Sequence, residues 1–94
     1  AKSVVCFLRI GIARENNVLV VCNLTPVPRY NYRAGVPSSG YWKEVLNSDA
    51  KDYGGSGQGN MGGVEAAPIS IHGKSHSLSL TLPPLSLLIF KKVS

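Results

Sequence analysis

Short apolar runs separated by turns make up the pattern of hydrophobic and polar positions along this chain. Val4–Ile10 is apolar except for Arg9, and its β-branched and aromatic residues predict a largely buried strand rather than a helix. A polar turn over Gly11–Asn17 leads to a second apolar run, Val18–Leu24. This run ends at Thr25–Pro28, because the two prolines there cannot donate backbone hydrogen bonds to a sheet. The pattern predicts a hairpin that joins the two strands.

The clearest period lies in the last quarter of the sequence. In His76–Leu82, leucine occupies every second position from Leu78 onward and serine or threonine fills the positions between, which predicts a half-buried strand. Pro83 and Pro84 then force a break. The last strand, Leu85–Phe90, is apolar on both faces, so we expect one of these faces to meet another layer of structure.

The middle of the chain is less regular. Tyr30–Val36 mixes aromatic and polar residues, Pro37–Gly40 supplies a turn, and Tyr41–Leu46 follows, so a second hairpin is predicted here. Asn47–Gly63 is a long glycine-rich loop. Val64–Ile71 is expected to form one more strand, although a proline weakens it.

These six or seven short strands, with no amphipathic helical stripe longer than two turns, predict an all-β fold. The expected architecture is an antiparallel β-sandwich with Greek-key connections. The 94 residues fit one domain, 1–94. Only 16% of them are charged, against about 25% in a typical soluble domain, so part of the surface is expected to be covered by a neighbour. The apolar run that starts within three residues of Ala1 suggests a piece cut from a longer protein.

The distribution of charge and hydropathy argues against two classes of partner, nucleic acids and membranes. The net charge is +5, but the basic residues are spread one or two per segment and only Lys91 and Lys92 are adjacent. A nucleic-acid surface would cluster them among aromatic residues, so no nucleic-acid partner is expected. The sequence has neither a signal-peptide pattern nor an apolar run near 18 residues, and we therefore expect no membrane association.

The two cysteines, Cys6 and Cys22, each lie within an apolar run and neither belongs to a C-x-x-C motif, so no zinc site is expected. The sequence leaves a disulfide open, but free thiols acting as small hydrophobic side chains fit better, together with a cytoplasmic location. His72 and His76 flank a predicted turn and have no third ligand nearby. No metal or other cofactor is predicted.

Catalytic chemistry is not indicated either. Glycosidic chemistry needs two facing carboxyl groups, and the only two that are close in sequence are Asp49 and Asp52. Both lie at the start of the glycine-rich loop, where Asp commonly bonds to nearby backbone. The loop itself lacks the Gly-Lys-Ser or Gly-Lys-Thr ending of a phosphate-binding loop. We therefore expect no catalytic residue in this chain.

The aromatic residues allow two interpretations. One is a stacking platform for glucose rings, and the other is a set of anchors for a small core or a domain interface. The sequence spacing does not place them on one surface, so both remain open. The candidates for glucan contact are Tyr30, Tyr32, Tyr41, Trp42 and Tyr53.

Four segments carry a family resemblance. They read VLVVCNLTPVPR (18–29), WKEVLNSD (42–49), YGGSGQGN (53–60) and HGKSHSLSLTLPP (72–84). In order and spacing they resemble the C-terminal end of bacterial glycogen branching enzymes, members of the alpha-amylase superfamily. The resemblance runs from about Ser3 to Phe90.

The resemblance implies a parent enzyme with a carbohydrate-binding-like domain, a central (β/α) barrel and a C-terminal β-sandwich, of which this chain resembles only the last. In that family a barrel aspartate attacks an alpha-1,4-linked glucan, a barrel glutamate acts as acid and base, and the chain is transferred to a 6-hydroxyl. None of those motifs has a matching position here. The expected function is that of a non-catalytic accessory domain that packs on the catalytic barrel and stabilises it. The alternative is a module that binds alpha-glucan or glycogen through its aromatic residues.

Overall fold

The computed structural model describes residues 4–11, 17–48, 60 and 62–93, and all of its regular structure is β-strand. The predicted loop residues 12–16 and 49–59 lie outside the described part. The strands are β1 (Val4–Arg9), β2 (Val18–Asn23), β3 (Arg29–Val36), β4 (Tyr41–Asn47), β5 (Gly63–Glu65), β6 (His76–Leu82) and β7 (Ser86–Lys92). Every strand pair is antiparallel. The predicted all-β fold is confirmed.

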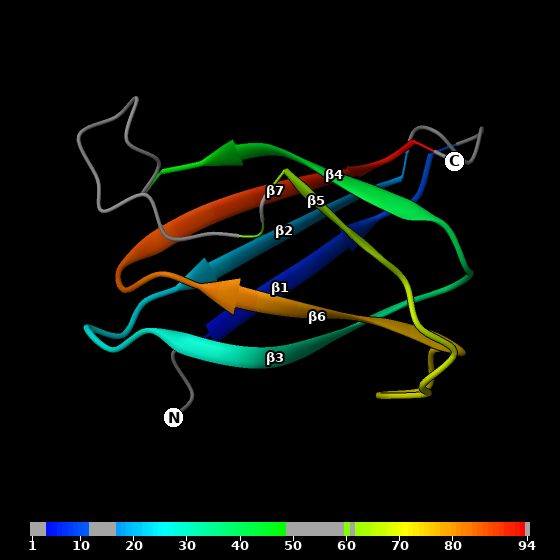
Figure 1. Cartoon of the computed structure of the whole chain (residues 1–94), viewed down its shortest axis with the longest axis horizontal. Coiled ribbons are helices and arrows are strands. Elements are labelled where there is room, and N and C mark those ends of the chain that lie inside the picture. The colour runs from blue at the N-terminus through cyan, green and yellow to red at the C-terminus, as the bar shows by residue number, and fades with distance from the viewer. Residues whose placement is uncertain (1–3, 12–16, 49–59, 61, 94) are drawn as a thin grey trace.

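The strands form two layers. A five-stranded sheet has the order β1-β2-β7-β4-β5, and a two-stranded sheet, β3-β6, lies in front of it in Figure 1. The connections from β2 to β3, β3 to β4, β5 to β6 and β6 to β7 each pass from one sheet to the other. The result is the antiparallel sandwich with Greek-key connections that the sequence predicted. The β1–β2 hairpin is also confirmed, with pairs running from Val4 opposite Asn23 to Arg9 opposite Val18.

The second predicted hairpin is wrong. β3 pairs with β6, whereas β4 pairs with β5 and β7 in the other sheet. The physical reason is burial, because Ala34 and Val36 of β3 and Trp42 of β4 are packed into the same core from opposite layers. The turn over Pro37–Gly40 therefore carries the chain across the sandwich. The strand predicted over Val64–Ile71 is also shorter than expected and covers only its first residues, as β5.

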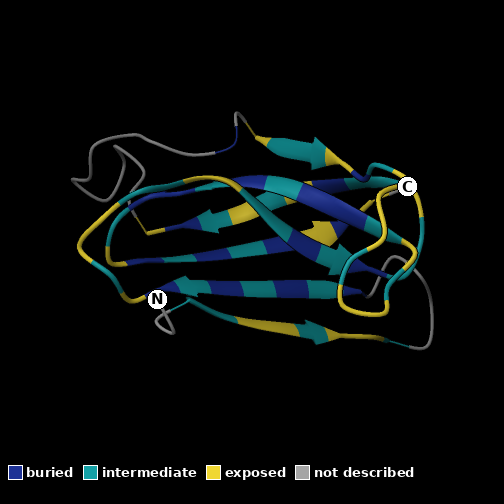
Figure 2. Ribbon diagram, turned by 90° about the horizontal axis from the view of Figure 1, so that it is seen from below, coloured by how far each residue is buried: buried dark blue, intermediate teal, exposed yellow. Residues whose placement is uncertain are grey.

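The leucine alternation of β6 is confirmed. Leu78, Leu80 and Leu82 are at most 1% exposed and face the five-stranded sheet, and Figure 2 shows buried positions alternating along the strands. Burying a leucine side chain contributes about 1.5–3 kcal/mol, so this row supplies much of the core. One serine of the predicted polar face, Ser77, is buried too. Its hydroxyl donates to the Ile69 carbonyl at 2.7 Å and accepts from the Arg33 guanidinium at 2.9 Å.

Candidate functional site

The outer face of the five-stranded sheet, which points away from β3 and β6, is the first candidate surface. The register aligns Phe7 with Val20 and Val20 with Ile89, so these three side chains lie side by side across β1, β2 and β7. Phe7 is 60% exposed. We call this surface the outer apolar face, and its strand residues are Val5, Phe7, Val18, Val20, Cys22, Leu46, Leu87 and Ile89. The exposed Leu24 and Leu85 directly follow β2 and precede β7 at one end of this face.

The outer face of the two-stranded sheet is different. Its side chains are polar, among them Arg33 on β3 and Ser79 and Thr81 on β6. An exposed sheet face of an isolated domain normally alternates in this way, with polar residues toward water. The five-stranded sheet instead presents apolar side chains on both faces, and such a patch marks an interaction surface.

One end of the outer apolar face is built by two turns. The β2–β7 register ends at the pair Asn23–Ser86. Leu24 follows Asn23, Leu85 precedes Ser86, and the backbone N–H of Leu85 donates to the Thr25 carbonyl at 2.9 Å. Both leucines stay exposed, at 60% and 69%. Leu85 also has φ = 48°, a left-handed conformation that costs a residue with a Cβ about 1–2 kcal/mol.

The buried Asn23 side chain fixes this end. Its Nδ2 donates to the carbonyls of Val27 and Pro83, both at 3.0 Å. Its Oδ1 accepts from the backbone N–H of Thr25 at 3.1 Å and from the Thr25 hydroxyl at 2.6 Å. A rigid, hydrogen-bonded scaffold thus holds Leu24 and Leu85 in the solvent.

The structure does not gather the predicted aromatic residues on one surface. Trp42 is fully buried between the sheets and offers no ring face to a ligand. Tyr32 packs against the core from β3, whereas Tyr41 belongs to β4 in the other sheet. Tyr30 is 62% exposed. Tyr53 lies outside the described residues.

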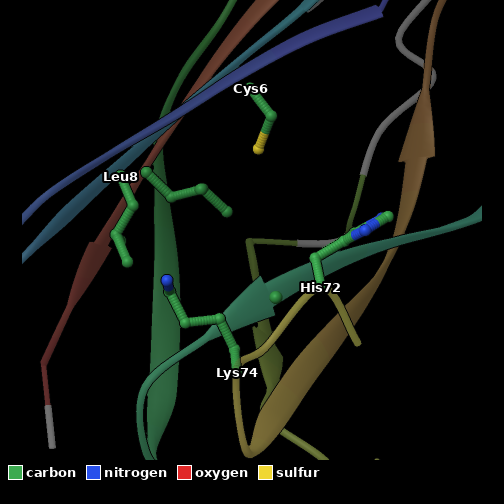
Figure 3. A pocket seen from close by; sticks show the side chains of 6 residues that line it. Cys6, Leu8, His72 and Lys74 are labelled. Atoms are coloured by element: carbon green, nitrogen blue, oxygen red, sulfur yellow. The ribbon is translucent and has the colours of Figure 1, made fainter. Parts of the chain in front are cut away.

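A pocket opens on the side of the sandwich where β1 and β3 face each other. Its volume is about 430 Å³. Cys6 and Leu8 line it from β1, and Figure 3 shows the Lys74 side chain reaching toward Leu8 from the opposite wall, which also contains His72. The remaining lining residues are Leu19 and Gly35.

This pocket is poorly suited to nucleophilic chemistry. Cys6 and Cys22 are free thiols. Although part of Cys6 is exposed, desolvation of its thiol raises the pKa, and the nearby Cys22 raises it further. The pKa of Tyr32 is raised as well, first by burial and then by Cys6, while Arg29 opposes the shift. Both groups therefore keep their protons at neutral pH.

Metal ligands and paired carboxylates are likewise not assembled in the part of the chain that the structure describes. No group of three or more His, Cys, Asp or Glu side chains could hold a metal ion there. The sequence predicted a turn flanked by His72 and His76, whereas in the structure His72 lies within the turn between the bridged residues Ile71 and Lys74. Glu44 accepts a hydrogen bond from Asn60 at 2.9 Å. Asp49 and Asp52 lie outside the described residues.

Within the described residues there is no helix of the length and apolarity needed to cross a bilayer.

Comparison with known proteins gives a consistent result. The family model described as "Alpha amylase, C-terminal all-beta domain" matches residues 1–93. The 1,4-alpha-glucan branching enzyme GlgB of Aquifex aeolicus is 60% identical over 90 residues, which are 96% of this chain and 14% of that protein. The enzyme of the same name from Albidiferax ferrireducens is 59% identical over 91 residues, 97% of this chain and 15% of that protein.

A third relative, the 1,4-alpha-glucan branching enzyme GlgB of Burkholderia thailandensis, is 57% identical over 89 residues, 95% of this chain and 11% of that protein. The chain therefore spans only a small part of the length of the relatives that it matches. The match to the family model and the antiparallel sandwich agree, and the chain belongs to the alpha-amylase C-terminal all-beta domain family.

Proposed function

We propose that this chain is the C-terminal accessory domain of a 1,4-alpha-glucan branching enzyme and that its outer apolar face packs on the catalytic barrel of the parent protein. The domain supplies no catalytic group and stabilises the barrel by covering apolar surface. The parent transfers alpha-1,4-linked glucan segments to 6-hydroxyls in the cytoplasm, a compartment that suits two free thiols.

The observation that carries this proposal is the outer apolar face itself. Phe7, on the edge strand β1, is 60% exposed, and its cross-strand neighbours Val20 and Ile89 are only half-buried. Contacts between domains of one chain usually bury about 600–1,500 Å², and a five-stranded sheet face can supply an area of that order. Family membership and the identity to branching enzymes support the choice of partner.

The glucan-binding alternative receives less support. A sugar platform needs exposed aromatic rings on one surface, but Trp42 is buried and Tyr32 packs against the core. Tyr30 and Tyr41 belong to different sheets. Trp42 and Tyr32 contribute to the core instead.

The test is a charged substitution in the outer apolar face, made in two contexts. In the 94-residue chain, Phe7→Asp should cost less than about 1 kcal/mol, because the side chain is exposed on an edge strand. In the parent enzyme the same change should lower the melting temperature by several degrees, because it places an unpaired charge in an apolar contact. The matched control is Ile69→Asp, which changes another exposed apolar residue away from this face.

Deletion of residues 1–94 from the parent should also lower the melting temperature of its catalytic part. An unchanged melting curve for the deletion, or equal effects of Phe7→Asp and Ile69→Asp in the parent, would contradict the proposed function. The isolated chain should show no branching activity, and activity recovered from it would contradict the accessory role.

A further inference from the structure

Three cations lie in one row across the outer face of the five-stranded sheet. The register places Arg9 opposite Val18, Val18 opposite Lys91, and Lys91 opposite Lys43. The row thus crosses β1, β2, β7 and β4, and the side chains of Arg9, Lys43 and Lys91 are all exposed. In the sequence these three residues are more than thirty positions apart from one another, so only the fold brings them together.

This arrangement is unfavourable for the chain by itself. Lys43 and Lys91 are direct cross-strand neighbours, and like charges in that position destabilise a sheet. No carboxylate of the described residues forms an ion pair with any of the three cations. Among the residues that the structure describes, an acidic side chain on this face is Glu65 on β5, which lies opposite Tyr41, outside the row.

Protection of a sheet edge does not explain the two lysines. Lysine is common on edge strands because it discourages pairing with another chain. However, β7 is the third strand of five and β4 is the fourth, so Lys43 and Lys91 lie in the interior of the sheet. The next residue, Lys92, is used differently, since its side chain is buried and its Nζ donates to the Ser39 carbonyl at 2.8 Å.

The row also borders the apolar surface on one side only. Phe7, Val20 and Ile89 form the adjoining row, and at the opposite end β2 and β7 adjoin the uncharged residues Leu24 and Leu85. A partner that fits this face must be apolar in the middle and carry negative charge along one border. The two ends of the face therefore differ in charge, and a complementary partner surface fits it in one orientation only.

We propose that the cation row of Arg9, Lys43 and Lys91 receives carboxylates from the catalytic part of the same parent chain and so fixes the orientation in which the domain docks. This inference rests on the proposed function and names the contacts that determine its geometry. Carboxylates placed there would neutralise the repulsion between Lys43 and Lys91, and partial exclusion of water would strengthen the attraction.

Carbodiimide cross-linking of the intact parent enzyme tests this inference. The reagent joins a lysine amine to a carboxyl group in contact with it, and mass spectrometry of the digested protein identifies the two residues. Lys43 and Lys91 should be linked to Asp or Glu residues outside residues 1–94. Lys74, on the pocket wall away from this face, is the matched control and should give no such link. Acetylation of the 94-residue chain establishes that the amines of Lys43, Lys91 and Lys74 are all accessible to a reagent.

The outcomes are distinguishable. Absence of links from Lys43 and Lys91, or equal links from Lys74, would overturn the cation-row assignment. Links between a labelled and an unlabelled copy of the protein would also overturn it, because the partner would be a second molecule.

A second measurement separates this inference from the proposed function. Lys43→Glu with Lys91→Glu should lower the melting temperature of the parent in low salt, and the difference from the unsubstituted protein should shrink in 0.5 M NaCl because salt screens the contact. Lys74→Glu should show no such salt-dependent loss. If Phe7→Asp destabilises the parent but the double substitution does not, the docking face stands and the role of the cations is wrong.

Discussion

Asn60 and Thr81 exchange two hydrogen bonds. The Thr81 backbone N–H donates to Asn60 Oδ1 at 2.7 Å, and Asn60 Nδ2 donates to the Thr81 carbonyl at 3.0 Å. The same Nδ2 donates to Glu44 Oε2 at 2.9 Å. Because Thr81 belongs to β6 and Glu44 to β4, one buried side chain links the two sheets.

Replacing this side chain should therefore destabilise the fold. Asn60→Ala leaves the Thr81 backbone groups and Glu44 without their partners, and an unsatisfied buried group costs about 1–3 kcal/mol. We expect a loss of about 2–3 kcal/mol in the free energy of unfolding, measured by urea denaturation of the 94-residue chain. The control is Ser75→Ala, which removes an exposed hydrogen bond to the Pro37 carbonyl. Equal losses in the two variants would contradict the linking role of Asn60.

A substitution at Leu85 should change the stability of the 94-residue chain and that of the parent enzyme differently. Leu85→Asn should stabilise the 94-residue chain by about 1 kcal/mol, because asparagine tolerates the left-handed conformation that leucine adopts there. The same substitution should not stabilise the parent enzyme, since it removes an apolar side chain from the docking face. Thermal unfolding of both proteins measures the difference.

The matched control is Leu24→Asn, which changes an exposed leucine beyond the same end of the sheet, at a similar exposure but with no left-handed backbone. It should give no gain in either protein. A destabilised 94-residue chain carrying Leu85→Asn would show that the turn, rather than a partner, requires the leucine.

The raised pKa values of Cys6 and Tyr32 predict a loss of stability at alkaline pH. Both groups have a higher pKa in the folded than in the unfolded state. Their contribution to the free energy of unfolding is therefore complete below the pKa of the unfolded state, and it is lost as the pH rises from there through the pKa of the folded state. For Cys6 the loss begins near pH 9, the ordinary value for a thiol. Cys6→Ala should unfold with a flatter pH dependence between pH 8 and 10, measured by urea denaturation at each pH. An identical slope in both proteins would count against the desolvation of this thiol.

Glycogen binding by the isolated chain is a further test. Because Trp42 is buried and the exposed Tyr30 belongs to the other sheet, soluble glycogen should leave both the tryptophan fluorescence and the native-gel mobility unchanged. Tyr30→Ala should behave identically. Retardation that disappears in Tyr30→Ala would favour the glucan-binding alternative.

The sequence predicted the features that depend on neighbours along the chain. The alternation of Leu78, Leu80 and Leu82 specifies a strand with one buried face, and β6 has that form. The doubly apolar Leu85–Phe90 segment correctly indicated a strand with apolar side chains on both faces, although Leu85 itself lies in the turn before β7.

The local sequence pattern did not predict which distant strands pair with each other. The turn at Pro37–Gly40 has the same residue preferences whether it closes a hairpin or carries the chain to another sheet, so the choice depends on burial of residues far away. For the same reason the spacing of Trp42 and Tyr41 did not separate a core position from a surface one. The meeting of Lys43 with Lys91 depends on the β4–β7 register, which no local pattern specifies.

The position of β7 has a consequence for biosynthesis. The last strand of the domain is inserted between β2 and β4, so the five-stranded sheet remains in two separate parts until β7 leaves the ribosome. The nascent chain cannot complete its core stepwise, and premature termination before Ser86 would leave two unpaired strand edges as templates for aggregation. Closure of the five-stranded sheet thus waits for the synthesis of β7.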